Sequence, residues 1–349
     1  MNLADFQYSY HTHPQVKALS GSLSGDHSTI QLTGLSGSAL SVVLSSVFTT
    51  GDFNRSMLVV LDDADSAAYT FNDLKHLLSV DRVYYFPSSY KKAIKLSQLD
   101  ASNEILRTEV LNRIANHPAP LIVVTYPEAI VQKVVSAHGI KTRMLKLKTG
   151  ESISISFLAE MLHEYGFQRV DFVYEPGQYS VRGGIVDIFS FAYELPYRCD
   201  FFGDELESIR VFDIESQLSK EQVTEVEIIP DLHKEKELAM EAIFSFIDNN
   251  TLLVFSDIRF VKEKLNQLYD EALVKANSGE KVVSDLHSTH ITGEELIPLI
   301  KPFTILETGD KTYFKADVSV GFRTSPQPIF HKNFDLVADN LKKGMQEEY

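Results

Sequence analysis

The chain has 349 residues, a length that predicts two or three domains. Hydrophobic residues make up 44% of the chain, enough to bury a sizeable core, which excludes a disordered protein. Asp and Glu number 48 against 33 Lys and Arg, and the resulting net charge of -15 opposes non-specific binding to a polyanion such as DNA.

The composition also excludes several kinds of site. Cys199 is the only cysteine, so the chain has neither a disulfide framework nor a cysteine-based zinc site. No apolar run reaches the length of a membrane span. Residues 1–13 contain neither the basic nor the apolar region of a signal peptide. We therefore expect a cytoplasmic protein with no membrane partner.

The first part of the chain alternates between apolar strands and helices. The pattern predicts strand, glycine-rich turn and helix over residues 28–48, strands over 56–63 and 82–87, helices over 66–78 and 101–116, and strand, turn and helix over 120–135. Because the strands are almost uniformly apolar, they are expected to form a parallel sheet covered on both faces. The predicted fold class is α/β.

The rhythm changes near Lys141, which indicates an inserted α+β domain. Strand, helix and strand are expected over residues 145–175, and four closely spaced strands follow as far as Phe212. From about Ser219 the α/β pattern returns, with helices over 235–249, 258–277 and 333–349 and a strand over 251–257. The predicted domains are 1–140, 141–218 and 219–349. Residues 278–290 are expected to be an exposed segment, and the pattern assigns them no role.

The stretch GLSGSALS matches the phosphate-loop frame G-x-x-x-x-G-K-[ST] only at its ends, Gly34 and Ser41. Gly37 lies inside it, but Ala39 replaces the second glycine and Leu40 replaces the lysine. The lysine neutralises the β- and γ-phosphates, and the glycine lets backbone N–H groups wrap around them. Either this loop binds nucleotide weakly or it is a plain turn between a strand and a helix.

A second nucleotide motif is also incomplete. The strand TLLVFSD ends in Asp257, as a Walker B strand does, but Ile258 follows where a helicase has a glutamate that polarises the attacking water. An Asp in this position is also a good cap for the next helix, and this interpretation is favoured. Together the two motifs predict a P-loop fold without its catalytic groups.

Other candidates for chemistry are weak. His11 with His13, and His287 with His290, could be metal pairs, but neither pair has a third ligand at a suitable spacing. No G-x-S-x-G motif occurs, and nothing around Cys199 indicates an activated thiol. We expect no catalytic residue and no metal site.

Residues 196–213 are expected to form a hairpin around Gly203-Asp204. The alternation of a strand places Tyr197, Cys199 and Phe201 on a core face, and Arg198, Asp200 and Phe202 on the other. An aromatic residue on a charged face either packs on a neighbouring element or binds a partner. In a simple two-residue hairpin Asp200 would oppose Glu207, and a nearby arginine would relieve the repulsion.

Arg182 is a candidate for that arginine, since it precedes Gly183-Gly184 at the head of an apolar stretch. The glycines are expected to allow a bulge or a twist that directs Arg182 outward. Arg182, Arg198 and Phe202 would then share an exposed surface, and arginine and aromatic residues are enriched at binding hot spots. The alternative is that the arginines are ordinary edge-strand charges, which discourage aggregation.

The segment YSVRGGIVDIFSFAYELPYRCDFFGDELESIRVFDIESQ (Tyr179 to Gln217) closely resembles the corresponding segment of bacterial transcription-repair coupling factors. The excision-repair helicase subunit UvrB has a similar RGxxxDIF pattern followed by R-x-[DE]-F-F-G-[DE]. GLSGSALS resembles the decayed phosphate loop of the coupling factors, and TSPQPIFHKNFDLVADNL (Thr324 to Leu341) resembles the end of their N-terminal module.

The resemblance implies a RecA-like lobe made of two segments, domains 1a and 1b, with domain 2 inserted between them. It also implies that domain 2 binds UvrA, the damage-recognition ATPase of nucleotide excision repair. The residues that match the family's contacts are Arg182, Arg198 and Phe202. Asp200 and Glu207 are added because of their proximity.

The resemblance further implies that this chain is a non-catalytic N-terminal module that needs no cofactor. In the family, ATP and Mg²⁺ act in motor domains further along the chain, and RNA polymerase and DNA are partners of the full-length translocase. A C-terminal domain is expected to cover domain 2 in the full-length protein. The alternatives are a nucleotide-hydrolysing fragment of a DNA helicase, a direct DNA-binding module, and a structural scaffold with no tight partner.

Overall fold

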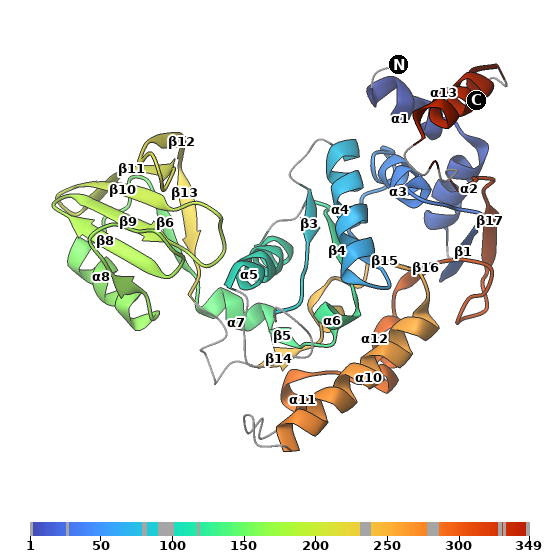
Figure 1. Cartoon of the computed structure of the whole chain (residues 1–349). Coiled ribbons are helices and arrows are strands. Elements are labelled where there is room, and N and C mark those ends of the chain that lie inside the picture. The colour runs from blue at the N-terminus through green and yellow to red at the C-terminus, as the bar shows by residue number, and fades with distance from the viewer. Residues whose placement is uncertain are drawn as a thin grey trace.

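The computed structural model describes residues 3–25, 28–78, 82–89, 101–116, 119–230, 239–277, 286–326, 330 and 333–346. They form an α/β lobe and a smaller β-rich domain beside it, which lies at the left of Figure 1. Within these ranges no helix is long and apolar enough to cross a membrane. The predicted segment 278–290 lies mostly outside the described residues; only its end, with α11 (Leu286–Thr289), is placed.

A seven-stranded sheet forms the centre of the lobe, in the order β17-β1-β16-β15-β2-β4-β3. Every pairing in it is parallel, as the uniformly apolar strands predict. All positions of β2, β4 and β15 are buried. The strands are β1 (Thr29–Thr33), β2 (Met57–Val60), β3 (Val83–Tyr85), β4 (Ile122–Thr125), β15 (Leu252–Phe255), β16 (Thr304–Thr308) and β17 (Val318–Gly321).

Helices cover both faces of this sheet. Figure 1 shows α3 and α4 on one side of the strands and α10 and α12 on the other. The helices of the lobe are α1 (Leu3–His11), α2 (Pro14–Leu23), α3 (Ala39–Phe48), α4 (Ala64–Leu78), α5 (Ala101–Asn116), α6 (Pro127–Ile130), α7 (Ala137–Thr142), α9 (Ile243–Phe246), α10 (Ile258–Asn277), α12 (Gly293–Ile300) and α13 (Phe334–Gln346). The predicted α/β lobe is confirmed.

Two predicted helices differ from the structure. The helix expected within residues 120–135 ends after α6, because the β-branched pair β5 (Val134–Val135) forms a strand with β14 (Met240–Glu241). The helix expected over 235–249 is wrong in its described part, where β14 is followed by the single turn of α9. Residues 231–238 lie outside the described ranges.

The inserted domain is a six-stranded sheet, in the order β12-β11-β10-β9-β8-β7, packed on helix α8 and a two-stranded sheet of β6 and β13. Its elements are β6 (Leu145–Lys148), α8 (Ile155–Glu164), β7 (Gln168–Arg169), β8 (Gln178–Arg182), β9 (Ile185–Phe189), β10 (Tyr197–Phe202), β11 (Glu205–Phe212), β12 (Ser219–Val223) and β13 (Glu225–Ile228). Leu158 and Leu162 of α8 pack on the face that carries Val186, Ile188 and Cys199.

The predicted end of this domain at residue 218 falls inside its sheets. β12 pairs with β11, and β13 pairs with β6. The side chains of Val226 and Ile228 belong to the same buried cluster as α8. The inserted domain therefore continues through Ile228, because residues 219–228 complete the strands that the domain began with.

Candidate functional site

Gly183 and Gly184, which follow Arg182, form a turn and not a bulge. Arg182 ends β8 and pairs with Ile185 at the start of β9, so Gly183-Gly184 is a two-residue hairpin connection. Gly183 has a φ of 61°, which favours glycine. A Cβ on Gly184 would lie 2.7 Å from the carbonyl oxygen of Phe201. Of the predicted bulge or twist, the bulge is wrong, and the turn places Arg182 at an exposed end of the sheet.

The second hairpin follows the predicted alternation. Gly203 has a φ of 64°, and Phe202 pairs with Glu205 across the turn. Tyr197, Cys199 and Phe201 are buried, as expected from the strand period. Burial raises the pKa of the Cys199 thiol, so this cysteine is part of the core and is not an activated nucleophile.

The pairing of Asp200 differs from the prediction. A β-bulge shifts the register between Asp200 and Phe201, so Asp200 faces Ser208 and the exposed Glu207 has no residue opposite it. Asp200 accepts hydrogen bonds from Ser208 Oγ at 2.7 Å and from Arg210 Nη2 at 2.6 Å. The expected repulsion from Glu207 and its relief by Arg182 are therefore wrong, since the bulge removes the first and Arg210 supplies the countercharge.

The outer face, which we define as the side of the six-stranded sheet opposite α8, has a buried carboxylate at its centre. Asp187 is 1% exposed and lies between Arg182 and Arg198. Arg182 Nη2 donates to its Oδ2 at 2.5 Å. Arg198 donates to both carboxylate oxygens, from Nε at 2.7 Å and from Nη2 at 2.9 Å. We call Arg182, Asp187 and Arg198 the arginine cluster.

Aromatic rings support both guanidinium groups. The Arg198 guanidinium lies 4.3 Å from the ring centroid of buried Phe212, and that of Arg182 lies 4.7 Å from the ring of Phe172, which is half-exposed. Gln217 also accepts two hydrogen bonds from Arg198, through its backbone and side-chain oxygens. The hydrogen bonds to Asp187 raise the pKa of Arg198, so its guanidinium group stays protonated.

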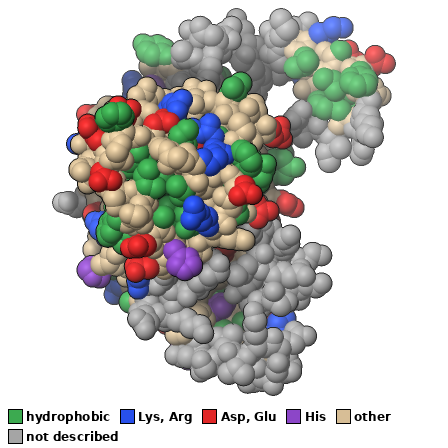
Figure 2. Space-filling model, turned by 90° about the vertical axis from the view of Figure 1, so that its left-hand side faces the viewer, with side chains coloured by type: hydrophobic (Ala, Val, Ile, Leu, Met, Phe, Trp, Pro, Cys, Tyr) green, Lys and Arg blue, Asp and Glu red, His purple; other side chains and the backbone are tan. Residues whose placement is uncertain are grey.

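Apolar side chains lie exposed beside these charges. Phe202 is 75% exposed, Tyr174 is also largely exposed, and Phe172 is half-exposed. Figure 2, which views the molecule from the side of the inserted domain, shows hydrophobic side chains interspersed with basic and acidic ones on that side. The prediction that Arg198, Asp200 and Phe202 share one face is confirmed. Sequence reasoning missed Asp187, Arg210 and Phe172, although the DIF that follows RGG was a usable signal for the first.

The phosphate-loop segment is a strand-to-helix turn closed by its neighbours. Gly34 has a φ of 71°, and a Cβ on it would lie 2.0 Å from the carbonyl oxygen of Phe322. Thr324 donates to the Gly34 carbonyl from both its backbone N–H and its hydroxyl. Leu40 packs against the core of the lobe, and the buried Ser41 hydroxyl donates to Asp73 at 3.3 Å.

Ala39 and Gly37 complete this turn. Ala39 is the first residue of α3, and its N–H donates to the carbonyl of Ser36 within the loop. Gly37 has a φ of 56°. The side chains of the loop thus serve the fold, and the segment offers no cation of its own to a phosphate.

Asp257 caps a helix, as the favoured interpretation of its motif predicts. Its Oδ1 accepts the N–H of Phe260 at 2.9 Å in the first turn of α10. The nearby Glu307 is fully buried on β16, and its two oxygens accept the N–H groups of Ile258 and Tyr313. Burial raises the pKa of this carboxyl. Both acids at the carboxyl edge of the sheet therefore bind backbone groups.

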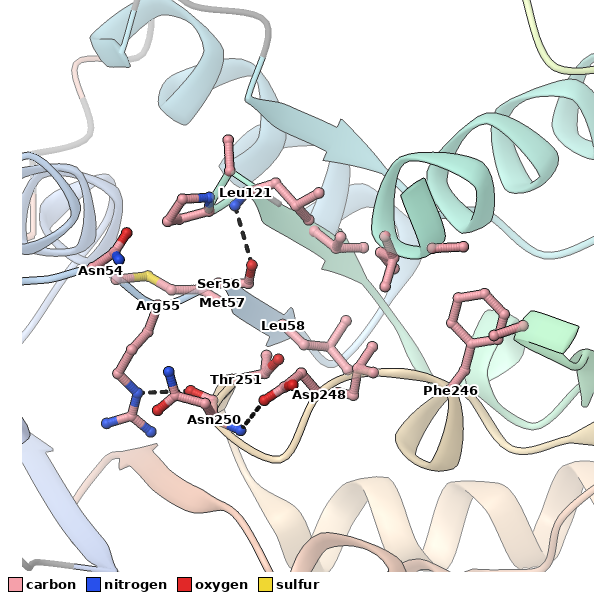
Figure 3. A pocket seen from close by; sticks show the side chains of 17 residues that line it. Asn54, Arg55, Ser56, Met57, Leu58, Leu121, Phe246, Asp248, Asn250 and Thr251 are labelled. Atoms are coloured by element: carbon pink, nitrogen blue, oxygen red, sulfur yellow. Dashed lines mark hydrogen bonds between the residues drawn. The ribbon is translucent and has the colours of Figure 1, made fainter. Parts of the chain in front are cut away.

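A pocket of about 490 Å³ lies at the opposite edge of the sheet (Figure 3). It is lined where β2, β4 and β15 begin, whereas the phosphate-loop segment follows the end of β1. Arg55 at its mouth donates from Nε to the Asn250 carbonyl at 2.7 Å. Because all strands are parallel, this pocket lies at the opposite end of the strands from the phosphate-loop segment.

A second cleft, of about 710 Å³, lies between the lobe and the inserted domain. Asn112 of α5 donates across it to Glu227 at 2.9 Å and to the Tyr193 hydroxyl at 3.3 Å. Burial, with Glu227 nearby, raises the pKa of Tyr193 to about 12, so this phenol stays protonated at neutral pH. These contacts join the two domains.

Among the described residues, neither histidine pair belongs to a group of three potential metal ligands. His11 Nε2 contacts the Thr49 hydroxyl at 2.7 Å, and His13 stacks on Phe322. His290 is buried beside Thr289. His287 packs against Tyr269.

Comparison with known proteins identifies the inserted domain. Residues 145–233 match the UvrB interaction domain. The transcription-repair-coupling factor of Bacillus subtilis is 30% identical over 260 residues, which cover 70% of this chain and 22% of that protein. That of Escherichia coli is 39% identical over 101 residues, which cover 29% and 9%. The chain is related to the transcription-repair-coupling factors and carries a UvrB interaction domain.

This relationship confirms the resemblance seen in the RGG, PYR and DFFG motifs. The arginine cluster and Phe202 all lie within the matched residues of the UvrB interaction domain. The chain spans about a fifth of the length of the Bacillus subtilis relative, since their match covers 22% of it. The match therefore does not assign the activity and partners of the full-length relatives to this chain.

Proposed function

We propose that this chain recruits UvrA through the outer face of its UvrB interaction domain, and so couples stalled transcription to nucleotide excision repair. The observation that carries the proposal is the largely exposed Phe202 on the same face as a fixed arginine cluster. The match of residues 145–233 to the UvrB interaction domain supports it. Asp200 and Glu207 flank this site.

The chemistry of the site favours an acidic protein partner with an apolar pocket. Arg182 can donate charge-assisted hydrogen bonds to a carboxylate, and Phe202 can leave water by entering the pocket. The positive groups lie on a chain whose net charge is -15, so the attraction is local to this face. Binding of this kind lets the domain present to UvrA the same groups that UvrB presents.

The chain itself acts without catalysis or cofactor in this proposal. The phosphate-loop segment has Leu40 in place of lysine, and Asp257 caps α10. ATP, Mg²⁺, RNA polymerase and DNA would be engaged by other parts of a full-length coupling factor. A C-terminal domain of that protein would cover the outer face until the protein engages its target, and this chain would then present the face uncovered.

Binding of this chain to purified UvrA, measured by calorimetry, tests the proposal. Phe202→Ala should weaken binding by about 30-fold, which corresponds to about 2 kcal/mol for a central anchor. Phe157→Ala is the matched control, because Phe157 is also exposed but lies on α8, on the other side of the sheet. Wild-type chain that does not bind UvrA, or equal losses in the two variants, would refute the proposal.

A further inference from the structure

The two arginines of the cluster differ in how many N–H groups they have left for a partner. Arg198 makes four hydrogen bonds, two to Asp187 and two to Gln217, and a guanidinium has five N–H groups. Its side chain is 14% exposed. Arg182 makes two, to Asp187 and to the Asp171 carbonyl at 3.4 Å, and is 32% exposed. Three of its N–H groups have no acceptor within the part of the chain that the structure describes.

Asp187 connects the two arginines. Its carboxylate is buried on β9, directly between the strands that carry them, and Arg198 is the residue opposite it on β10. Arg198 is itself clamped between Phe212 and Gln217. Gln217 has a φ of 58°, a conformation that costs energy in a residue other than glycine and that its contacts with Arg198 hold in place. Arg198 thus holds the Asp187 carboxylate in place, and the carboxylate in turn orients the Arg182 guanidinium.

We infer that Asp187 is a positioning residue for partner binding, and that Arg198 acts through it while Arg182 contacts the partner. The inference rests on the proposed function and assigns different roles to two arginines that the family resemblance treats alike. A guanidinium held in one orientation loses less conformational freedom on binding a carboxylate than a free one does. The pair Arg198 and Asp187 supplies that orientation without touching the partner.

A double-mutant cycle on UvrA affinity tests the inference. Asp187→Asn should weaken binding by about tenfold in the wild-type background, but by about twofold or less in an Arg182→Ala background, because the group that it positions is gone. A merely structural role would lower affinity by the same factor in both backgrounds. Equal factors would overturn the inference.

A second cycle keeps the test decisive if Asp187→Asn does not fold. Arg198→Lys retains a cation beside Asp187 but loses the planar fork. The inference predicts that it weakens binding by about threefold or more in the wild type and has almost no effect in the Arg182→Ala background. The same loss in both backgrounds would show that Arg198 contacts the partner itself. Circular dichroism of each variant checks the fold.

The design separates this inference from the proposed function. If wild-type chain binds UvrA and Phe202→Ala weakens binding by about the 30-fold expected, the surface is correct whatever the cycles show. Additive cycles would then refute only the positioning role. If wild-type chain does not bind, the proposed function and the inference that rests on it both fail.

Discussion

The phosphate-loop segment and the arginine cluster both lie near glycine turns at strand ends, yet they differ in the groups that remain free to bind a ligand. In the loop, Thr324 occupies the Gly34 carbonyl and Leu40 packs into the core. In the cluster, Arg182 keeps N–H donors, and Phe202 on the same face is uncovered. The comparison teaches that a glycine turn indicates a close approach of backbone, and that only the surrounding side chains decide whether a partner can use it.

The largest expected effect separates the buried ring of the outer face from its exposed ring. Phe212→Ala should destabilise the inserted domain by about 3–5 kcal/mol, because it empties a fully buried site and removes the support of Arg198. Phe202→Ala should change stability by about 0.5 kcal/mol or less. Urea unfolding followed by circular dichroism measures both. Equal destabilisation would contradict the contrast between a supporting and a contacting aromatic residue.

The next effect concerns a buried histidine of the lobe. Burial, and then the charges of Lys133 and Arg107, lower the pKa of His290 to about 4. Between about pH 6.5 and this value the unfolded chain binds a proton that the folded chain does not, so stability falls as the pH falls. The loss should approach about 3 kcal/mol at the acid end of the window.

Urea unfolding across this pH range measures the loss, with His290→Gln as the comparison. Glutamine does not titrate, so the variant should lose this part of the pH dependence while the carboxylates keep theirs. An unchanged slope would mean that His290 does not hold a lowered pKa.

A smaller effect tests whether the acids at the carboxyl edge of the sheet stabilise the lobe. Glu307→Gln should destabilise the lobe by about 1–3 kcal/mol, because the amide can accept only one of the two backbone N–H groups that the carboxylate accepts. Asp310→Asn, at an exposed position just beyond β16, is the control and should have almost no effect. Thermal unfolding distinguishes the two variants. A Glu307→Gln protein as stable as the control would show that the carboxylate is not needed by the backbone.

The sequence predicted the α/β lobe, the inserted domain and the exposed face because strand periodicity is local. Tyr197, Cys199 and Phe201 alternate with Arg198, Asp200 and Phe202 without any long-range contact. The bulge at Glu207 could not be read this way, since it depends on how β11 pairs with β10. Nor could the end of the domain, because β12 and β13 join strands formed much earlier in the chain.

The organisation of the site was also beyond local reasoning. Arg182 and Asp187 lie on adjacent strands of one hairpin, but Arg198, Phe212 and Gln217 come from three later positions. A carboxylate in an apolar strand looks costly in isolation, and its two guanidinium partners become evident only in the folded sheet. The turn at Gly183-Gly184 was not evident for the same reason, because it depends on the pairing of β8 with β9.

The last prediction is that no activity appears when the phosphate-loop frame is restored. Ala39→Gly combined with Leu40→Lys rebuilds the frame G-x-x-x-x-G-K-[ST], and it should change stability by about 1 kcal/mol, since Leu40 is only partly buried. A phosphate-release assay should still detect no ATP hydrolysis. The N–H of Ala39 turns back to Ser36, Asp257 remains bound to the first turn of α10, and Ile258 stands where a glutamate would polarise water. Hydrolysis by the double variant would show instead that two side chains alone separate the lobe from an ATPase, and would place the two regions much closer in chemistry than their contacts indicate.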